Sequence, residues 1–360
     1  MRIGIDGREL GGEPTGVGRY LQRLLAEWSR GEASARHRFT IYSPNGRIGV
    51  PPDFPGEVAL VPGQGGTWWE QGALAAAVRR DRPDVLFAPG YSAPVLTGVP
   101  TVVAIHDVSF AAHPEWFTPR EGWRRRVLAR LSGRRARTVL TISQFSRDEI
   151  VKYLHVPLER IRVVRLGVGL DGPPPVETRR EALVLFVGAI FNRRHLPLLV
   201  QAFARVAAQN PAARLVVVGK NRTFPQQDLP AIAASAGVAD RVSFLDWVDD
   251  AQLASLYARA SAFAFLSEYE GFGFTPLEAL SAGVPSVVLD TSVAREVYGD
   301  AALRVAPQVD EVAVALTDLL DASSPRRQTL VRVAPEVLSR YSWTRAAAET
   351  LAVLEEAAGR

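Results

Sequence analysis

The sequence contains no cysteine, has only two lysines (Lys152 and Lys220), and shows no long apolar run. Without cysteine the chain has no disulfide bonds, thiolate metal sites or cysteine nucleophiles. No apolar stretch reaches the roughly 18 residues that a membrane-spanning helix needs. The first six residues resemble a short strand with a charge inside it, which is not the pattern of a signal peptide. We therefore expect a cytoplasmic protein, with membrane association only at the cytoplasmic face.

Several catalytic signatures are also missing. The sequence has no serine nucleophile elbow, no zinc-ligand spacing and no Walker motif. Asp246, Asp249 and Asp250 approach an aspartate metal motif, but turn and capping roles between a strand and a helix explain them. The net charge of +4 and the isoelectric point near 9.6 favour anionic partners such as nucleotides or lipid phosphates. This excess of positive charge is too small to indicate nucleic-acid binding.

Short apolar strands alternate with amphipathic helical segments along all 360 residues. The alternation is typical of α/β folds whose parallel sheets carry helices on both faces. Strands are expected at 2–5, 39–43, 58–61, 85–88, 102–105, 139–142 and 161–164, and then at 183–187, 215–218, 242–245, 262–266 and 286–289.

The glycine- and proline-rich stretch 166–176 separates the two series of strands and is the clearest linker. We expect two Rossmann-like, doubly wound domains, at 1–170 and 171–342, that face a ligand cleft. A helical segment at 343–360 follows them.

The most informative motif runs from Glu270 to Glu278, two carboxylates that stand eight residues apart. The turn between them begins with Gly271, Phe272, Gly273 and Phe274. The preceding apolar run 262–266 predicts a buried strand, and Thr275 with Pro276 predicts a helix start. Backbone N–H groups of such a turn, with the helix dipole behind them, form an anion site. A sugar nucleotide lying over the turn would meet one carboxylate at each end.

A structural explanation accounts for part of this motif. Thr275 and Glu278 match a capping box, in which Glu278 reaches back to the N–H group of Thr275. The capping box explains Glu278, but it leaves Glu270, Gly271 and Gly273 unexplained. The motif therefore favours a ligand site, with the helix cap as the alternative role for Glu278.

Polar residues follow two strands of the first series. Gly16 and Gly18 come after the first strand and open a helix expected to run to about residue 28. A lone G-x-G pair fits a tight turn as well as a ligand loop. His106 and Asp107 follow the strand 102–105, where a parallel strand delivers side chains to the ligand edge. Asp107 also fits a simple turn-capping role.

In the second series, Arg193 and Arg194 stand at the expected start of a helix. Cations oppose the helix dipole at this position by about 0.3–1 kcal/mol, and a bound anion would remove the conflict. Two solvated arginines are the alternative. Lys220, which follows Gly219, is a second phosphate candidate.

Residues 118–137 contain eight arginines. The spacing of four apolar residues predicts one helix face, made of Trp123, Val127, Leu128 and Leu131. Such a helix usually packs its apolar face and solvates its charges, and contact with anionic lipid is the alternative. The adjacent Trp68 and Trp69 are expected in the core rather than in a stacking platform.

Residues 270–278 resemble the E-x7-E element of the retaining glycosyltransferases of family 4, also called group 1, which have the two-domain GT-B fold. The strongest match spans residues 262–285. The loop at Gly16 and Gly18 is similar to the T-G-V-G-R-Y loop of that family. Residues 186–196 are similar to its V-G-x-x-x-x-R-K-N-L segment, with Arg194 where the family has lysine. The resemblance covers nearly the whole chain.

The resemblance implies roles for the second domain. Arg194 and the amides of 271–274 would stabilise the departing diphosphate. Glu278 would hold the ribose hydroxyls, and Glu270 the hydroxyls of the donor sugar. Because cationic side chains and a helix start offset the leaving charge, no metal ion or other cofactor is implied.

For the first domain, the resemblance implies that 1–170 binds the acceptor. Gly16 and Gly18 would reach toward the donor phosphates, and His106 would orient the sugar. The final helix, 343–360, would cross back to pack on this domain.

The expected activity is the transfer of a hexose from a nucleoside-diphosphate sugar to a hydroxyl of a glycan or lipid-linked acceptor. The similarity to mannosyltransferases of polysaccharide assembly favours GDP-mannose as the donor. A GT-B sugar-nucleotide epimerase or hydrolase is the alternative enzyme. A two-lobed sugar-nucleotide-binding protein without catalysis is the alternative from another class.

Overall fold

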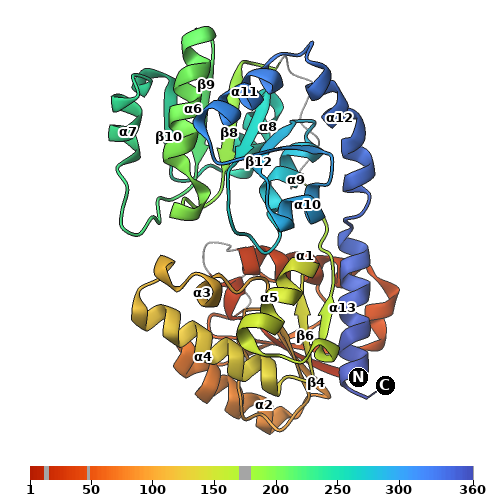
Figure 1. Ribbon diagram of the computed structural model, residues 1–360. Helices are drawn as coiled ribbons and strands as arrows, with labels where there is room; N and C mark the ends of the chain where they lie inside the picture. Colours follow the sequence, from red (N-terminus) through yellow and green to blue (C-terminus); the bar gives the residue numbers. More distant parts are fainter. Residues whose placement is uncertain (12–15, 47–48, 170–179, 360) are drawn as a thin grey trace. The chain divides into compact units, whose positions relative to one another are not determined.

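The computed structural model describes residues 1–11, 16–46, 49–169 and 180–359 and divides the chain into two compact units (Figure 1). The first unit holds Met1–Gly167 with Tyr341–Arg360, and the second holds Val168–Arg340. Most of the expected linker, residues 170–176, lies outside the described residues, as does Thr15 of the glycine loop.

The first unit contains a seven-stranded parallel sheet in the order β3-β2-β1-β4-β5-β6-β7. Its strands are β1 (Arg2–Asp6), β2 (Arg38–Ser43), β3 (Glu57–Leu60), β4 (Val85–Ala88), β5 (Thr101–Ala104), β6 (Thr138–Thr141) and β7 (Ile161–Val163). Its helices are α1 (Gly16–Arg30), α2 (Ala75–Asp81), α3 (Ser109–Ala112), α4 (Pro119–Arg135), α5 (Gln144–Leu154) and α13 (Trp343–Ala357). Short helical turns are η1 (Arg8–Leu10), η2 (Glu32–Arg36), the π-helical η3 (Trp69–Leu74), η4 (Pro114–Trp116) and η5 (Leu158–Arg160).

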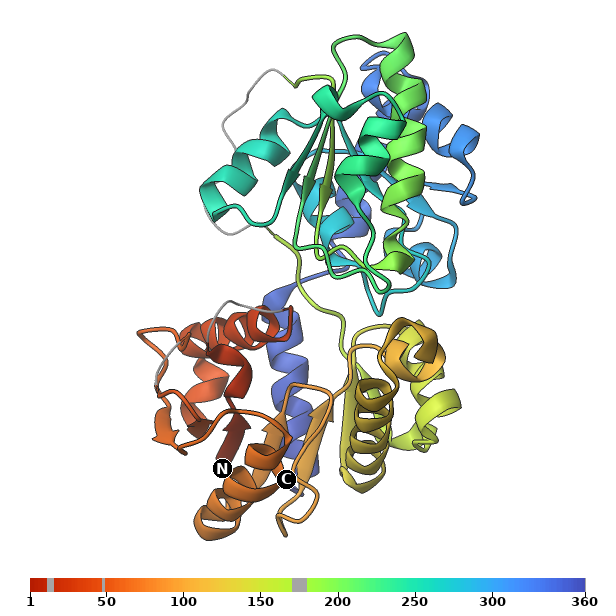
Figure 2. The same cartoon turned by 90° about the vertical axis from the view of Figure 1, so that its left-hand side faces the viewer.

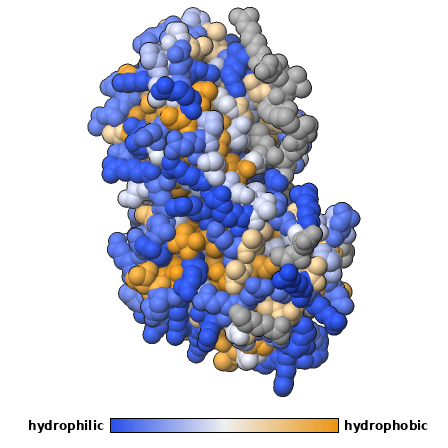
Figure 3. All heavy atoms as spheres, turned by 90° about the vertical axis from the view of Figure 1, so that its right-hand side faces the viewer, coloured by the Kyte–Doolittle hydropathy of each residue, from blue (hydrophilic) through white to orange (hydrophobic). Residues whose placement is uncertain are grey.

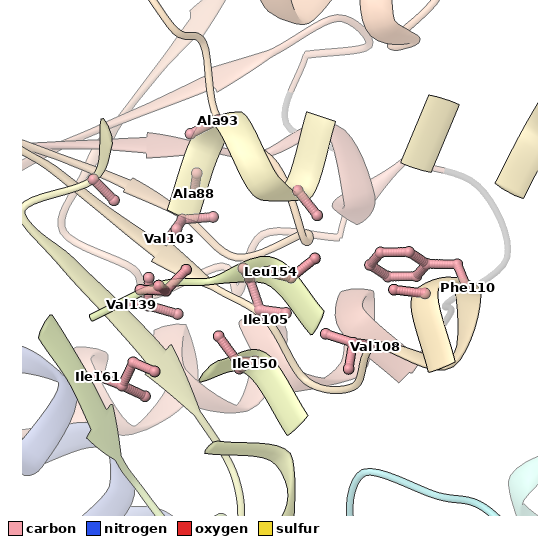
Figure 4. Close-up of a cluster of buried hydrophobic side chains, with 14 residues drawn as sticks. Ala88, Ala93, Val103, Ile105, Val108, Phe110, Val139, Ile150, Leu154 and Ile161 are labelled. Atoms are coloured by element: carbon pink, nitrogen blue, oxygen red, sulfur yellow. The ribbon is translucent and has the colours of Figure 1, made fainter. Parts of the chain in front are cut away.

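The core of the first unit forms where the apolar central strands meet their covering helices (Figure 4). Ile105 and Val139 come from the neighbouring β5 and β6 segments, and Ile150 and Leu154 come from α5. All four side chains are fully buried. Strands β4, β5 and β6 are buried along their whole length, as expected for parallel strands covered on both faces.

The last helix of the chain, α13, belongs to the first unit, where it contacts α1 and strands β4, β5 and β6. The indole Nε1 of Trp28 donates a hydrogen bond to the carbonyl oxygen of Ala347 at 3.0 Å. Thr344 Oγ1 donates to Glu27 Oε2 at 2.8 Å. Figures 1 and 2 both show this helix running along the first sheet. The C-terminal residues therefore complete the first unit and cover part of its sheet.

The second unit contains a six-stranded parallel sheet in the order β10-β9-β8-β11-β12-β13. Its strands are β8 (Leu183–Val187), β9 (Arg214–Val218), β10 (Val242–Leu245), β11 (Ala262–Phe265), β12 (Ser286–Leu289) and β13 (Ala302–Val305). Its helices are α6 (Leu196–Gln209), α7 (Leu229–Ser235), α8 (Asp250–Arg259), α9 (Phe274–Ser281), α10 (Ser292–Tyr298), α11 (Val309–Leu320) and α12 (Pro325–Leu338), with short turns η6 (Asn192–Arg194) and η7 (Ala239–Arg241). Helices α6 and α11 pack together, and so do α9 and α12.

The twelve strands expected from the sequence are all present, with ends that differ by one residue at most. Strand β13 was not predicted. It lies at the edge of its sheet, only Ala302 of its four residues is buried, and Arg304 interrupts its apolar run. A short edge strand of this kind carries too little periodic signal to be recognised.

Helix α4 packs through a different face from the one that the sequence predicted. Its buried residues are small: Gly122, Ala129, Ser132 and Gly133. A Cβ atom on Gly133 would lie 2.8 Å from a methyl carbon of Val156, so glycine permits a close approach here. Trp123 is 62% exposed and Leu131 is 40% exposed. The predicted apolar stripe is wrong because close packing at this position selects small side chains.

The two adjacent tryptophans have opposite environments. Trp69 is buried, and its Nε1 donates to the carbonyl oxygen of Val61 at 2.8 Å. Trp68 is 91% exposed. The expectation of core positions is therefore correct for Trp69 and wrong for Trp68, because consecutive helical residues point in different directions.

The described surface is mainly polar. On the face shown in Figure 3, hydrophilic residues cover most of the area, and apolar residues form smaller groups between them. None of the helices in the described ranges has both the length and the apolar character needed to cross a membrane.

Candidate active site

The candidate site of the second unit lies where the strand order of its sheet reverses. Strands β8 and β11 are parallel neighbours there, and β9 lies on the far side of β8. The segments that leave their carboxyl ends contain Gly188 to Arg194 and Ser267 to Gly273. In doubly wound sheets this reversal is where ligands bind. The fold thus brings the two most informative sequence motifs to one edge.

Arg194 and Glu270 form an ion pair at this edge. Arg194 Nε donates to Glu270 Oε1 at 2.8 Å, and the two side chains are only 13% and 15% exposed. Ser267 Oγ donates to the same carboxylate oxygen at 2.9 Å. Burial acts to raise the pKa of Glu270, but the charges of Arg194 and Arg193 and the two hydrogen bonds hold this pKa below its ordinary value. Glu270 is therefore a charged carboxylate at neutral pH.

The arginine is held from several sides. Arg194 Nη1 donates to the carbonyl oxygen of Ala189 at 2.7 Å, and the guanidinium carbon lies 4.8 Å from the ring centroid of Phe265. Gly188 has a φ of +136°, and a Cβ atom there would lie 2.6 Å from Arg194 Nη1. Glycine at 188 thus makes room for the guanidinium at the end of β8.

Arg193 contacts the backbone of the segment that carries Glu270. Its Nε donates to the carbonyl oxygen of Tyr269 at 3.2 Å, and its guanidinium lies 4.3 Å from the ring centroid of Phe191. The exposed Lys220 follows β9, and its carbonyl oxygen accepts from the N–H group of Ile190 at 2.9 Å. Both candidate cations therefore flank the segment that carries Arg194.

The glycine turn ends in helix α9, which begins two residues earlier than the sequence predicted. Gly273, with a φ of +84°, occupies the N-cap position, and no side chain caps the helix. Thr275 is thus inside the helix, and its Oγ1 is buried without a hydrogen-bond partner in the described part of the chain. The capping-box explanation of Glu278 is wrong, because positive φ at a glycine starts this helix instead of a threonine side chain.

Tyr298 fixes the shape of the turn. Its hydroxyl donates to the carbonyl oxygen of Gly273 at 2.9 Å, and a Cβ atom on Gly273 would collide with that hydroxyl. Glu278 lies within α9, where its Oε2 accepts from the hydroxyl of the buried Tyr257 at 3.3 Å. Neither tyrosine was identified from the sequence, because both contacts join segments more than 20 residues apart.

In the first unit, His106 is a buried imidazole that donates one hydrogen bond to the backbone. The residue is 8% exposed, and Nε2 lies 3.0 Å from the carbonyl oxygen of Pro89. Since a carbonyl only accepts, Nε2 carries the proton and Nδ1 carries the lone pair. Burial lowers the pKa of His106 to about 4, against smaller raising effects from the Pro89 carbonyl and the Asp107 charge.

The remaining first-unit candidates occupy different positions. Gly16 and Gly18 form the first turn of α1, with Gly16 exposed and Gly18 buried. Asp107 Oδ1 accepts from the N–H group of Ser109 at 2.9 Å, which confirms its turn-capping contact.

Asp249, the central member of the aspartate group, has a structural role. Asp249 is the N-cap of α8, and it forms a complete capping box with Gln252. Among the described residues, no group of three or more histidine, cysteine or acidic side chains is arranged to hold a metal ion. The similarity to an aspartate metal motif is thus explained by helix capping.

Comparisons with known proteins agree with this architecture. The model of the family described as Glycosyltransferase Family 4 matches residues 14–171, and that of Glycosyl transferases group 1 matches residues 174–336. The chain is 28% identical over 265 residues to O-antigen chain mannosyltransferase B of Escherichia coli, which covers 69% of this chain and 68% of that protein. It is 28% identical over 277 residues to the MMP alpha-(1->4)-mannosyltransferase of Mycolicibacterium hassiacum, covering 73% of this chain and 67% of that protein.

A solved structure extends the likeness to the whole fold. The structure of Anabaena Alr3699/HepE in complex with UDP and glucose has a TM-score of 0.74 and 19% sequence identity, and the match covers 99% of this chain and 100% of that one. The two matching family models together span both units, and both sheets have the Rossmann-like strand order that the GT-B fold requires. The chain therefore belongs to the family 4, group 1 glycosyltransferases, and it is a glycosyltransferase with the GT-B fold.

Proposed function

We propose that this chain is a retaining glycosyltransferase that moves a hexose from a nucleoside-diphosphate sugar to a hydroxyl of a glycan or lipid-linked acceptor. The observation that carries the proposal is the Arg194–Glu270 pair beside the glycine turn, at the ligand edge of one sheet. A cation suits the diphosphate, the N–H groups at a helix start suit its oxygens, and carboxylates suit sugar hydroxyls. The name of the O-antigen chain mannosyltransferase supports a place in surface polysaccharide or glycolipid synthesis.

In the proposed reaction, the bond between the anomeric carbon of the sugar and the diphosphate oxygen breaks, and the electron pair leaves with the diphosphate. The acceptor oxygen forms its bond on the same face of the sugar, and its proton leaves with the diphosphate. Arg194 and the N–H groups of the turn stabilise the departing charge. Glu278 binds the ribose, Glu270 binds the donor sugar, and His106 accepts a hydrogen bond from a sugar hydroxyl.

Arg194 is able to bind phosphate while it remains paired with Glu270. A guanidinium carries five N–H donors, and the contacts with Glu270 and Ala189 engage its Nε and Nη1. The carboxylate then orients the guanidinium before the donor arrives, which lowers the entropic cost of binding. Arginine at this position also permits two parallel hydrogen bonds to phosphate, which lysine does not form.

Product analysis separates this function from its alternatives. The purified protein is incubated with the labelled sugar nucleotide alone, and then with an added polyprenyl-diphosphate-linked sugar acceptor. Transfer with retained anomeric configuration supports the proposal. An isomerised or hydrolysed donor in both incubations indicates an epimerase or hydrolase, and donor binding without any product indicates a binding protein.

GDP-mannose is the donor that we favour, because both named relatives are mannosyltransferases. A thermal-shift panel of GDP, UDP and their hexose derivatives tests this choice. A ligand at 100 times its dissociation constant adds about 2.7 kcal/mol to the free energy of unfolding. A larger increase in melting temperature with UDP-glucose than with GDP-mannose would show that UDP-glucose is the preferred donor. The proposed reaction class would be unchanged.

We also propose that the first unit contacts anionic membrane at the cytoplasmic face, through an aromatic and basic surface around Trp68 and Trp123. These two side chains are 91% and 62% exposed. Arg124 Nη1 donates to Thr67 Oγ1 at 2.6 Å, so the amino-terminal half of α4 lies beside the Trp68 segment. Exposed tryptophans among arginines suit the interface of an anionic bilayer.

Vesicle sedimentation tests the membrane contact. Wild-type protein is expected to sediment with vesicles of phosphatidylcholine and phosphatidylglycerol, and less with phosphatidylcholine alone. The double variant Trp68→Ser, Trp123→Ser is expected to lose most of this binding, whereas Trp247→Ser, on an exposed tryptophan of the second unit, is the matched control. Equal sedimentation of both variants would contradict the proposed surface.

A further inference from the structure

A strained turn follows β4 in the first unit. Tyr91 has a φ of +65°, and the N–H group of Ser92 donates to the carbonyl oxygen of Gly90 at 2.8 Å. A hydrogen bond between residues i and i+2 with positive φ in the middle defines the rare and strained form of the γ-turn. A tyrosine with positive φ is unusual in itself. The neighbouring Gly90 would take positive φ without strain, yet it is not among the described residues that do so.

A buried charged cluster holds this turn. Ser92 Oγ donates to Glu70 Oε1 at 2.8 Å, and Arg8 Nη2 donates to the same oxygen at 2.6 Å. Arg8 Nη2 also lies 3.3 Å from the carbonyl oxygen of Ser92, and Arg8 Nε lies 3.2 Å from Asp6 Oδ2. Asp6 and Glu70 are fully buried. A strained backbone conformation persists only where the surrounding structure holds it in place. Residues with such strain cluster at functional sites.

The same turn shapes the surroundings of His106. The carbonyl oxygen of Pro89, just before the turn, accepts from His106 Nε2. The Tyr91 ring meets the His106 ring edge-on, with centroids 5.6 Å apart and planes at 81°. Tyr20 meets His106 in the same manner at 4.8 Å. The imidazole is thus fixed by one hydrogen bond and two aromatic edges, which leaves Nδ1 as its acceptor atom.

Tyr91 also fixes a carboxylate beside this histidine. Its hydroxyl donates to Asp107 Oδ2 at 2.9 Å, and the other oxygen of Asp107 accepts from the N–H group of Ser109. Strands β1, β4 and β5 are consecutive neighbours in the sheet, and the order reverses between β1 and β4. The charged cluster, the turn and His106 therefore lie at the ligand edge of the first sheet.

We propose that Tyr91 is a positioning residue for sugar binding: the strained turn orients the His106 ring and the Asp107 carboxylate so that both accept hydrogen bonds from substrate hydroxyls. The cluster of Asp6, Arg8 and Glu70 supplies the rigid support for this turn. Two oriented acceptors suit a polyhydroxylated ligand, whose hydroxyl groups are the donors. The inference rests on the proposed glycosyl transfer, and it adds a residue that the sequence motifs did not include.

Substitution of Tyr91 separates strain from positioning. Tyr91→Gly relieves the positive φ and removes both side-chain contacts, whereas Tyr91→Phe keeps the ring and removes the bond to Asp107. Tyr91→Asn, which tolerates positive φ, replaces the glycine variant if that variant does not fold. The control is His155→Gly, because His155 is an exposed residue with a φ of +54° at the end of α5. His155→Gly is expected to keep wild-type transfer.

We expect Tyr91→Gly to melt near the wild-type temperature while kcat for transfer falls roughly 10-fold or more, and Tyr91→Phe to lose less. A second readout is the ¹⁵N spectrum of labelled histidine, with His106 assigned by its absence in His106→Gln. Wild-type His106 is expected as the Nε2–H tautomer and Tyr91→Gly as a tautomer mixture. Wild-type kcat together with an unchanged His106 signal in Tyr91→Gly would overturn the inference.

The two proposals fail in different ways. If wild-type protein transfers no sugar to any acceptor, the proposed function is wrong, and the histidine spectrum still decides whether Tyr91 positions His106. If wild-type transfers sugar and Tyr91→Gly matches it in kcat and spectrum, only the role of Tyr91 is wrong. A loss of folding in all three Tyr91 variants, with His155→Gly folded, would assign Tyr91 to stability and also overturn the inference.

Discussion

Arg194→Ala should separate two roles of one arginine, in stability and in diphosphate binding. The substitution leaves Glu270 as a carboxylate that is 15% exposed and has lost its 2.8 Å partner. Removal of one member of a buried ion pair costs about 3–5 kcal/mol. We expect the lower end of this range, because Ser267 still donates at 2.9 Å and the Nε of Arg193 lies 3.9 Å away.

The binding effect of Arg194→Ala has its own magnitude. A charged hydrogen bond contributes about 1.5–3 kcal/mol, so nucleoside diphosphate affinity should fall roughly 10- to 150-fold. Affinity for the nucleoside alone should change little, because it has no phosphate. Isothermal titration with GDP, guanosine, UDP and uridine measures both effects on the same protein.

The double variant Arg194→Ala, Glu270→Gln is the matched control. It removes both charges, so no carboxylate is left buried without its cation, and most of the lost stability should return. Diphosphate affinity should stay low, because the guanidinium is still missing. Equal loss of affinity for nucleoside and nucleoside diphosphate in Arg194→Ala would refute the phosphate contact and leave a purely structural pair.

Three further outcomes are expected. Glu278→Gln should reduce donor affinity by about 1.5 kcal/mol or more with little change in melting temperature, because glutamine still accepts from Tyr257; wild-type affinity would exclude Glu278 from the donor site. The pKa of His106 is about 4 in the folded protein and 6.5 in the unfolded chain. The unfolded chain therefore takes up a proton first as the pH falls from 6.5 to 4, which lowers the free energy of unfolding by about 3 kcal/mol in full. His106→Gln should lack this loss, and urea unfolding at pH 7.5 and 4.5 measures the difference. Transfer should persist in EDTA, and loss of activity restored by manganese would contradict a metal-independent reaction.

The fold was predictable because parallel strands covered on both faces are short apolar runs with helical segments between them. Strand β8, residues 183–187, has five consecutive buried residues and was located to the residue. Strand β13 and the packed face of α4 were not predicted. Both depend on tertiary packing, since β13 is completed by its neighbour β12 and α4 packs through glycines selected for close approach.

The candidate site was predictable as a set of residues but not as a set of contacts. In the sequence, Arg194 and Glu270 lie in separate motifs, 76 positions apart. The predicted contact of Arg194 was the diphosphate, and that of Glu270 was the donor sugar. Their ion pair follows from the pairing of β8 with β11, which no local pattern specifies. Tyr298 and Tyr91 were missed for the same reason, because each contacts a residue that follows a different strand: Gly273 after β11 and Asp107 after β5.

The two sheets use the same topological position in different ways. In the second unit, the reversal between β8 and β11 carries the Glu270 carboxylate, which is 15% exposed and therefore accessible to a ligand. In the first unit, the reversal between β1 and β4 carries Asp6, which is fully buried, with a pKa that burial raises to about 6 against the lowering effect of Arg8. A carboxylate so deeply buried cannot bind a substrate directly. Its cost in free energy is understandable if the cluster supports the strained turn at Tyr91, since a turn of that kind needs rigid surroundings.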